Sequence, residues 1–195
     1  GGANTHSFVT NGGATNTISS TNGGFMNMQG AATIPFTVAD GPNAVDLILS
    51  ATFNNGTIEK NGAGTMQVTT STGVGVGTSN VDINAGVLEI AGAAALGGGT
   101  FVGTIANDAT LRFNTTANQT LSGVISGTGN IEKQNTGTLT LSGDSTYTGT
   151  TAVTVGTVLV NGDNTAANGA VTVSANATLG GTGTIGGAVT VNDDG

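Results

Sequence analysis

The charged side chains are the first candidates for chemistry in this chain, and they are few. Eleven acidic residues, two lysines, one arginine and one histidine give a formal net charge of −8 at pH 7. Three basic residues cannot neutralise a run of phosphates, which excludes nucleic-acid binding as a main role. The sequence contains no cysteine, so thiol catalysis, disulfides and Cys/His zinc sites are also excluded.

Basic residues close to acids would be the parts of a polysaccharide lyase. Arg112 lies between two apolar residues, so we expect it to point outward from a strand as a solvated surface charge. Glu59-Lys60 and Glu132-Lys133 recur as adjacent pairs rather than as facing ones. We therefore expect each pair to mark an exposed, soluble strand end and not a catalytic site.

Paired carboxylates would suit a glycosidase, which needs two of them about 5–10 Å apart. The candidate aspartates are Asp82, Asp108, Asp144 and Asp163. They fall at different phases of the strand pattern, so we expect no acidic ladder, that is, no column of carboxylates running from coil to coil. His6 is expected at the surface, and Tyr147 is expected to pack its ring on a neighbouring corner with a solvated hydroxyl. Asp193-Asp194 is only a weak match to a calcium loop. We predict no catalytic, cofactor-binding or metal-binding residue, no cofactor and no enzyme activity; the ligand-binding residues are unknown.

The elements that hold these side chains are predicted to be short strands. Apolar and polar residues alternate in Leu139–Leu141, Val153–Val155, Val158–Val160 and Val171–Val173. Alternation with period two is typical of a strand with one buried face. A hydrophobic fraction of 36% and a modest net charge argue against disorder.

The sequence repeats itself at two periods. Residues 49–60, 64–68, 81–83 and 105–111 align with residues 121–133, 137–141, 153–155 and 173–179, at offsets of 72–73, 73, 72 and 68. Val153, Val171 and Val189 follow one another at equal intervals, and we expect them to lie directly over one another. Strand clusters that recur every ~18–23 residues, with Gly, Asn and Asp between them, indicate a β-solenoid.

We predict an all-β fold, a parallel β-solenoid of roughly nine or ten coils of ~18–23 residues each. The alternative is an antiparallel sandwich or barrel with turn signals every ~8–12 residues. Residues 1–195 are predicted to form a single β-helix segment. Within it, residues 1–46 are an irregular cap or looser coils, 47–113 are a diverged repeat copy and 121–191 are a clear copy.

Three segments of the clear copy resemble a known family. Leu121–Lys133, Gly137–Gly149 and Gly156–Gly162 are similar, in order and spacing, to the passenger-associated transport repeat of bacterial autotransporters. Residues 49–113 resemble a second copy, in which residues 70–79 replace the corner that contains Tyr147.

The resemblance implies a right-handed parallel β-helix at the surface of a Gram-negative bacterium, outside its outer membrane. It implies a stalk that supports export, folding and adhesion, with a glycan or protein on a host or other surface as its ligand. It also implies a C-terminal outer-membrane barrel elsewhere in the full-length chain. The sequence opens with Gly1-Gly2 and no Met, which we interpret as the start of a processed piece or fragment.

Two other functions stay open at this point. A solenoid with uncapped ends exposes open strands, so copies could stack end to end into a self-assembling extracellular fibre or sheath. A glycan-active β-helix enzyme is the less favoured alternative.

Overall fold

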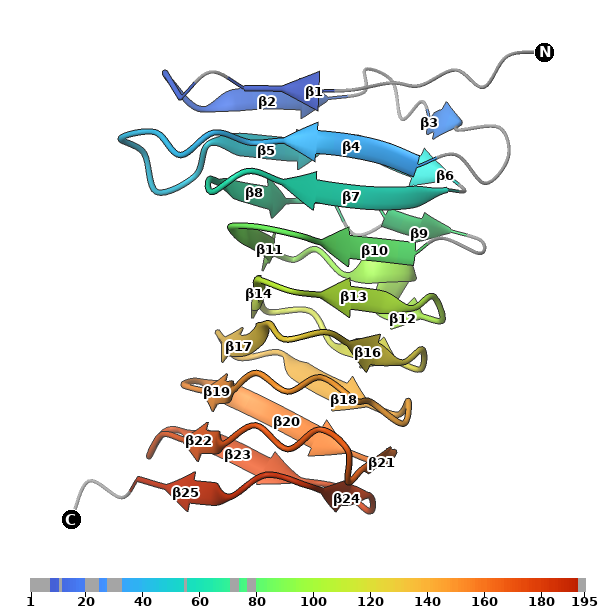
Figure 1. Ribbon diagram of the computed structural model, residues 1–195, viewed down its shortest axis with the longest axis vertical. Helices are drawn as coiled ribbons and strands as arrows, with labels where there is room; N and C mark the ends of the chain where they lie inside the picture. Colours follow the sequence, from blue (N-terminus) through green and yellow to red (C-terminus); the bar gives the residue numbers. More distant parts are fainter. Residues whose placement is uncertain are drawn as a thin grey trace.

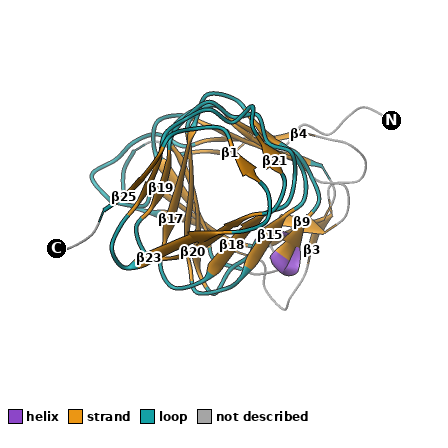
Figure 2. Ribbon diagram, turned by 90° about the horizontal axis from the view of Figure 1, so that it is seen from below, coloured by secondary structure: helices purple, strands orange, loops and turns teal. Residues whose placement is uncertain are grey.

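The chain winds into a stack of turns in which all the strands of its described residues pair in parallel, and this confirms the predicted parallel β-solenoid (Figure 1). The structure is a computed structural model that describes residues 8–10, 12–19, 25–27, 33–54, 56–70, 74–76 and 80–192. His6 and Asp193-Asp194 lie outside the described residues. Seen along its axis, the solenoid is a closed ring of strands joined by short corners (Figure 2).

Each full turn contributes one strand to each of three faces. The first face consists of β1 (Phe8–Val9), β4 (Thr33–Thr37), β7 (Thr57–Asn61), β10 (Asn80–Ile83), β13 (Ile105–Asn107) and β16 (Ile125–Ser126). It is extended by a two-stranded sheet of β21 (Asp163–Asn164) and β24 (Thr184–Ile185).

The second face is the longest sheet and continues in unbroken order from one end of the stack to the other. Its strands are β2 (Asn16–Ser19), β5 (Leu47–Ser50), β8 (Thr65–Val68), β11 (Val87–Gly92), β14 (Thr110–Thr115), β17 (Asn130–Gln134), β19 (Thr151–Val153), β22 (Val171–Val173) and β25 (Val189–Val191).

The third face is made of two sheets. The first contains β3 (Phe25–Asn27), β6 (Thr52–Asn54) and β9 (Val74–Val76). The second contains β12 (Thr100–Phe101), β15 (Gln119–Leu121), β18 (Thr138–Leu141), β20 (Gly156–Val160) and β23 (Ala177–Gly180). A 3-10 turn, η2 (Leu96–Gly99), precedes β12. Within the described ranges, the chain forms no helix long and apolar enough to span a bilayer.

The predicted number of coils, nine or ten, is too high, because about seven turns are complete. Among the described residues, seven turns have a strand on all three faces. The turn that holds β19 and β20 has no strand on the first face. The first turns are also longer than expected: Asn16 pairs with Leu47, whereas Thr110 pairs with Asn130 after a much shorter stretch of chain.

The predicted column of Val153, Val171 and Val189 is correct about which side of the sheet the valines occupy. The strand pairing at its start, however, is shifted by two residues. Val171 pairs with Val189, as predicted, but Val153 pairs with Val173 and not with Val171. The turn from β19 to β22 is therefore two residues longer than the valine spacing predicts. Because side chains alternate with period two, a slip of two residues leaves every side chain on its predicted side of the sheet.

The long-range repeat joins different faces of the solenoid. Ile58–Lys60 lies in β7 on the first face, and its copy, Ile131–Lys133, lies in β17 on the second. Gly64–Val68 and Gly137–Leu141 are likewise in or next to β8 on the second face and β18 on the third. The offset therefore equals three turns plus one face, and the same local sequence builds a corner at two different edges of the ring.

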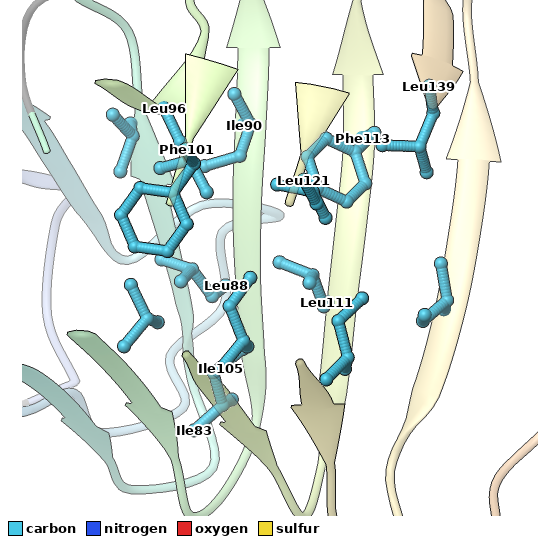
Figure 3. Close-up of a cluster of buried hydrophobic side chains, with 14 of the residues drawn as sticks. Ile83, Leu88, Ile90, Leu96, Phe101, Ile105, Leu111, Phe113, Leu121 and Leu139 are labelled. Carbon is cyan, nitrogen blue, oxygen red and sulfur yellow. The ribbon is translucent and has the colours of Figure 1, made fainter. Parts of the chain in front are cut away.

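Alternate residues of the central strands fill the interior. In β14, Leu111 and Phe113 are fully buried and stack on Leu88 and Ile90 of β11, as the close-up in Figure 3 shows. Burial of one such side chain contributes about 1.5–3 kcal/mol. The solenoid is thus held together by columns of apolar side chains that run along its axis.

Side chains at the corners tie consecutive turns together. Asn130 Oδ1 accepts hydrogen bonds from the Thr150 amide at 2.9 Å and from its hydroxyl at 3.0 Å, one turn later. Asn118 Oδ1 accepts from the Thr138 amide at 3.0 Å in the same way. These bonds satisfy backbone N–H groups where the strand ladder is interrupted.

Candidate functional site

Arg112 bridges carboxylates of the two neighbouring turns on the outer side of the second face. It is paired with Glu89 of β11 on one side and with Glu132 of β17 on the other. Its Nη1 lies 3.2 Å from Glu89 Oε2, and its Nε lies 2.6 Å from Glu132 Oε2. Partial burial disfavours the charge, but the bonds to Glu132 and Glu89 raise the pKa of Arg112. The side chain points outward, as predicted, but it is ion-paired and not a free solvated charge.

Glu59 and Asp82 occupy paired positions of β7 and β10 on the outer side of the first face. The amides of Asn61 and Asn84 donate to Glu59 Oε1 at 3.1 and 3.0 Å. Burial and then repulsion from Glu59 raise the pKa of Asp82 above its ordinary value. The prediction of no acidic ladder concerned the four aspartates and did not consider Glu59, which the register of β7 and β10 places directly beside Asp82. In the described part of the chain, no three or more acidic or histidine side chains gather as metal ligands do.

The other candidate aspartates bond to backbone amides at corners. Asp108 Oδ1 accepts from the Thr128 amide at 2.9 Å, and Asp144 Oδ1 accepts from the Asp163 amide at 2.8 Å. Hydrogen bonds from the hydroxyl and amide of Thr165 lower the pKa of Asp163. The structure gives these carboxylates a role in joining corners.

Both lysines of the chain are buried, which corrects the prediction of exposed strand ends. Lys60 is 0% exposed, and its Nζ donates to the backbone oxygens of Asn61, Gly62 and Ala85 at 3.1, 2.7 and 2.9 Å. Ala85 belongs to the next turn. Burial, opposed by the charge of Asp46, lowers the pKa of Lys60 to about 8.

Lys133 makes the same kind of contacts on another face. It is 1% exposed, and its Nζ donates to the oxygens of Gln134, Asn135 and Val155 at 2.9, 2.5 and 3.4 Å. Burial lowers the pKa of Lys133. The ion pairs found among the described residues all belong to Arg112, so backbone carbonyls rather than carboxylates hold both ammonium groups.

The alternation of the strands contains a signal that would have placed the lysines correctly. Ile58 is buried and Glu59 is only partly buried, so the period of two puts Lys60 inside. Ile131, Glu132 and Lys133 follow the same order. Lysine usually prefers solvent, and this preference alone predicts that both lysines are exposed. The alternation of inward and outward residues along the strand predicts instead that they are buried.

Tyr147 is also more buried than predicted. It is 6% exposed, and its hydroxyl lies 2.7 Å from the Thr151 hydroxyl, so it is not solvated. Desolvation raises the pKa of Tyr147, although the bond to Thr151 opposes the shift. Both side chains line a cavity of about 20 Å³ in the interior, which residues from all three faces of the last turns surround. Such a volume has room for about one water molecule and for no larger ligand.

The part of the chain that contains Lys133 and Tyr147 is similar to a known repeat. Residues 131–160, which contain Lys133, Tyr147 and Thr151, match the sequence model of the passenger-associated-transport-repeat family. Together with the parallel β-solenoid, this match agrees with the resemblance seen in residues 121–162: residues 131–160 are similar to a repeat found in autotransporter passengers.

One curated relative supports this assignment. A stretch of 79 residues, or 40% of this chain, is 46% identical to the "Adhesin BmaC autotransporter" of Brucella suis biovar 1 (strain 1330). The stretch covers 2% of that adhesin, so the chain spans a small part of the length of its relative. No solved structure matches the chain.

Proposed function

We propose that this chain is an extracellular, non-catalytic stalk segment of an autotransporter-like surface protein, which supports export, folding and adhesion. The observation that carries the proposal is the continuous nine-stranded parallel sheet that includes the matched repeat. The name of the relative, an autotransporter adhesin, supports a location at the surface of a Gram-negative bacterium. We also propose that the full-length protein has a translocating outer-membrane barrel and that it adheres to a ligand.

The physical basis of the proposed role is growth of the solenoid turn by turn. Each new turn buries apolar side chains such as Leu111 and Phe113 against the preceding one, at about 25 cal/mol per Å² of apolar surface. Nearest-neighbour stacking of this kind lets folding start at one place and spread. Folding outside the cell would then favour export in one direction. We propose a right-handed winding, with residues 1–46 as a cap or looser coils and 47–113 and 121–191 as two repeat copies.

The proposal is tested by deletion of residues 121–162 from the full-length protein on cells. We expect the amount of passenger at the surface, measured by flow cytometry with an N-terminal tag, to fall strongly. In the deletion variant, trypsin treatment of intact cells should also degrade the displayed passenger, whereas the wild-type passenger should resist it. Unchanged display and unchanged trypsin resistance would count against a role in export and folding.

The glycan-active alternative is tested in a simpler way. Glu59, in the aligned pair with Asp82, is held by Asn61 and Asn84, an arrangement that supports a structural role for the pair. Incubation of the chain with neutral and acidic polysaccharides should therefore leave their viscosity unchanged. A steady fall in viscosity would instead support the enzyme.

Self-assembly into a fibre is a second candidate, in which β25 would pair with another copy where no further turn of its own chain covers it. Val189 and Val191 are 45% and 69% exposed, although the residues they stack on, Val171 and Val173, are buried. Uncovered strand edges with apolar side chains promote stacking of copies. Size-exclusion chromatography and electron microscopy of the isolated chain distinguish the two: filaments favour the fibre, and discrete monomers favour the stalk.

A further inference from the structure

The corners at Lys60 and Lys133 share the same backbone geometry although they lie on different faces. In each, the second residue after the lysine has a positive φ: 78° at Gly62 and 68° at Asn135. Asn135 is the one residue other than glycine with a positive φ among the described residues. Asparagine tolerates this left-handed region better than most residues. In both corners this residue presents its carbonyl oxygen to the lysine Nζ, at 2.7 and 2.5 Å.

The next turn meets each corner in the same way. The third carbonyl comes from Ala85 at one corner and from Val155 at the other, and a glycine with positive φ follows each of them. A Cβ atom on Gly156 would lie 2.3 Å from the Asn135 oxygen and 2.8 Å from Lys133 Nζ. A Cβ atom on Gly86 would lie 2.6 Å from the Gly62 oxygen. Glycine is therefore what allows the second turn to approach the ammonium so closely.

The neighbours of the two lysine stems also correspond. Phe36 pairs with Lys60 from the turn before, and Phe113 pairs with Lys133. On the turn after, the paired residues are β-branched: Ile83 and Val153. The aliphatic part of each lysine is thus a member of an apolar column, and only its end group is polar.

We propose that each corner is a binding site for a primary ammonium group, formed by three backbone carbonyls of two successive turns, with the lysine side chain as its built-in ligand. The site would take a free primary ammonium ion of the right size if the side chain were removed. An ammonium has three N–H donors and no acceptor, which matches a set of three carbonyl oxygens. This inference concerns the fold itself and does not depend on the proposed role in export.

The site couples neighbouring turns, because no single turn supplies all its ligands. Two carbonyls come from the lysine's own corner and the third from the corner one turn later, at Ala85 for Lys60 and at Val155 for Lys133. Before that turn is in place, the ammonium lacks one acceptor. Once it is in place, loss of the N–H donors leaves inward carbonyls without partners, which is unfavourable in a dry interior.

The test is chemical rescue in the chain of residues 1–195. Lys60→Ala removes a fragment with the shape of n-propylammonium, and Lys133→Ala removes the same fragment from the other corner. We expect each variant to melt roughly 5–10 °C below the wild type. Propylammonium chloride should restore at least half of this loss. Tetramethylammonium chloride, which has the charge but no N–H donor, should restore none beyond the effect of sodium chloride at equal ionic strength.

A matched control separates the ammonium site from a simple cavity. Ile83→Ala and Val153→Ala open space in the same two columns without removing an N–H donor, so propylammonium should not raise their melting temperatures. Equal effects of propylammonium on these controls and on the lysine variants would overturn the proposal, as would equal rescue by tetramethylammonium. If Lys60→Ala and Lys133→Ala stay unfolded in every salt, Lys60→Met decides. It keeps an apolar stem, and stability equal to that of the wild type would also overturn the proposal.

Discussion

Lys60 and Lys133 occupy equivalent corners one face apart, but the charges around them differ. Both ammonium groups are enclosed by three carbonyls, and both stems stack on a phenylalanine of the preceding turn. Asp46 acts on Lys60 through its charge, whereas burial alone determines the pKa shift of Lys133. The common part of the two corners is therefore the backbone cage, and the carboxylate is an addition to one of them.

This difference shows how a solenoid can keep cations inside without forming ion pairs. Asp46 is itself engaged by the amides of Gly41 and Thr65, at 2.9 and 2.8 Å. It stabilises a corner of its own and influences Lys60 from a distance. A carbonyl cage depends on the backbone conformation of two successive corners, so the same sequence can form it on different faces of the ring.

The largest expected effect comes from removing the N–H donors while keeping the apolar stem. Lys60→Met should lower the free energy of unfolding by about 3 kcal/mol, because it leaves inward carbonyls without partners. Lys133→Met should cost less, about 2 kcal/mol, since its third contact is longer, 3.4 Å against 3.1 Å at most for Lys60. Urea unfolding followed by circular dichroism measures both. A larger loss at Lys133 than at Lys60 would show that contact distances do not determine the strength of the cage.

The second effect is a rise of stability with pH. Burial disfavours the charge of Lys60 more than its surroundings favour it, so its folded pKa, about 8, is below the ordinary 10.5, and the unfolded chain binds more protons between these values. The free energy of unfolding should therefore increase from pH 8 toward pH 10, by about 2 kcal/mol. Lys133 adds a contribution of the same sign. Above pH 10 the raised pKa of Tyr147 acts in the opposite direction, because the unfolded tyrosine then loses its proton first.

Lys60→Met is the control for this pH dependence. The variant should retain only the smaller rise due to Lys133. If its stability increases with pH as much as that of the wild type, the buried ammonium at residue 60 is not the group that titrates.

A smaller effect should separate the two corners electrostatically. Asp46→Asn removes the charge that opposes the shift at Lys60, so the pKa of Lys60 should fall further while that of Lys133 stays constant. The amide keeps one acceptor for Gly41 or Thr65, so the free energy of unfolding should fall by only about 1 kcal/mol. The chain has only two lysines, so NMR titration of their side-chain signals reports both corners in one sample. Equal shifts of both lysines would contradict the assignment of Asp46 to one corner.

Much of the fold follows from the sequence because alternation and repeat length are local properties. The pairing of Val171 with Val189 agrees with the predicted valine column. The slip at Val153 has a physical origin: two turns that differ in length by two residues give the same inward phase, so periodicity alone does not distinguish them. The number of turns was missed because loop lengths in residues 1–46 carry no periodic signal.

The lysine corners were missed for a different reason. The prediction relied on residue type, since lysine is almost never fully buried without a partner. The partners here are backbone oxygens whose direction depends on positive φ at Gly62 and Asn135. A sequence contains the glycine and the asparagine but does not show where their carbonyls point. The pairing of Glu59 with Asp82 depends in the same way on the length of a single turn.

The smallest effect is expected on the outside of the second face, where a cation is held by carboxylates instead of carbonyls. Arg112→Gln removes the contacts with Glu89 and Glu132, and the side chain is 26% exposed. Solvent screens such a pair, so the free energy of unfolding should fall by about 0.5 kcal/mol, and by less at high salt. Urea unfolding at low and high sodium chloride measures this difference. The losses in Lys60→Met and Lys133→Met should change little with salt, because their cages exclude water; a salt dependence as strong as that of Arg112→Gln would place those ammonium groups in contact with solvent.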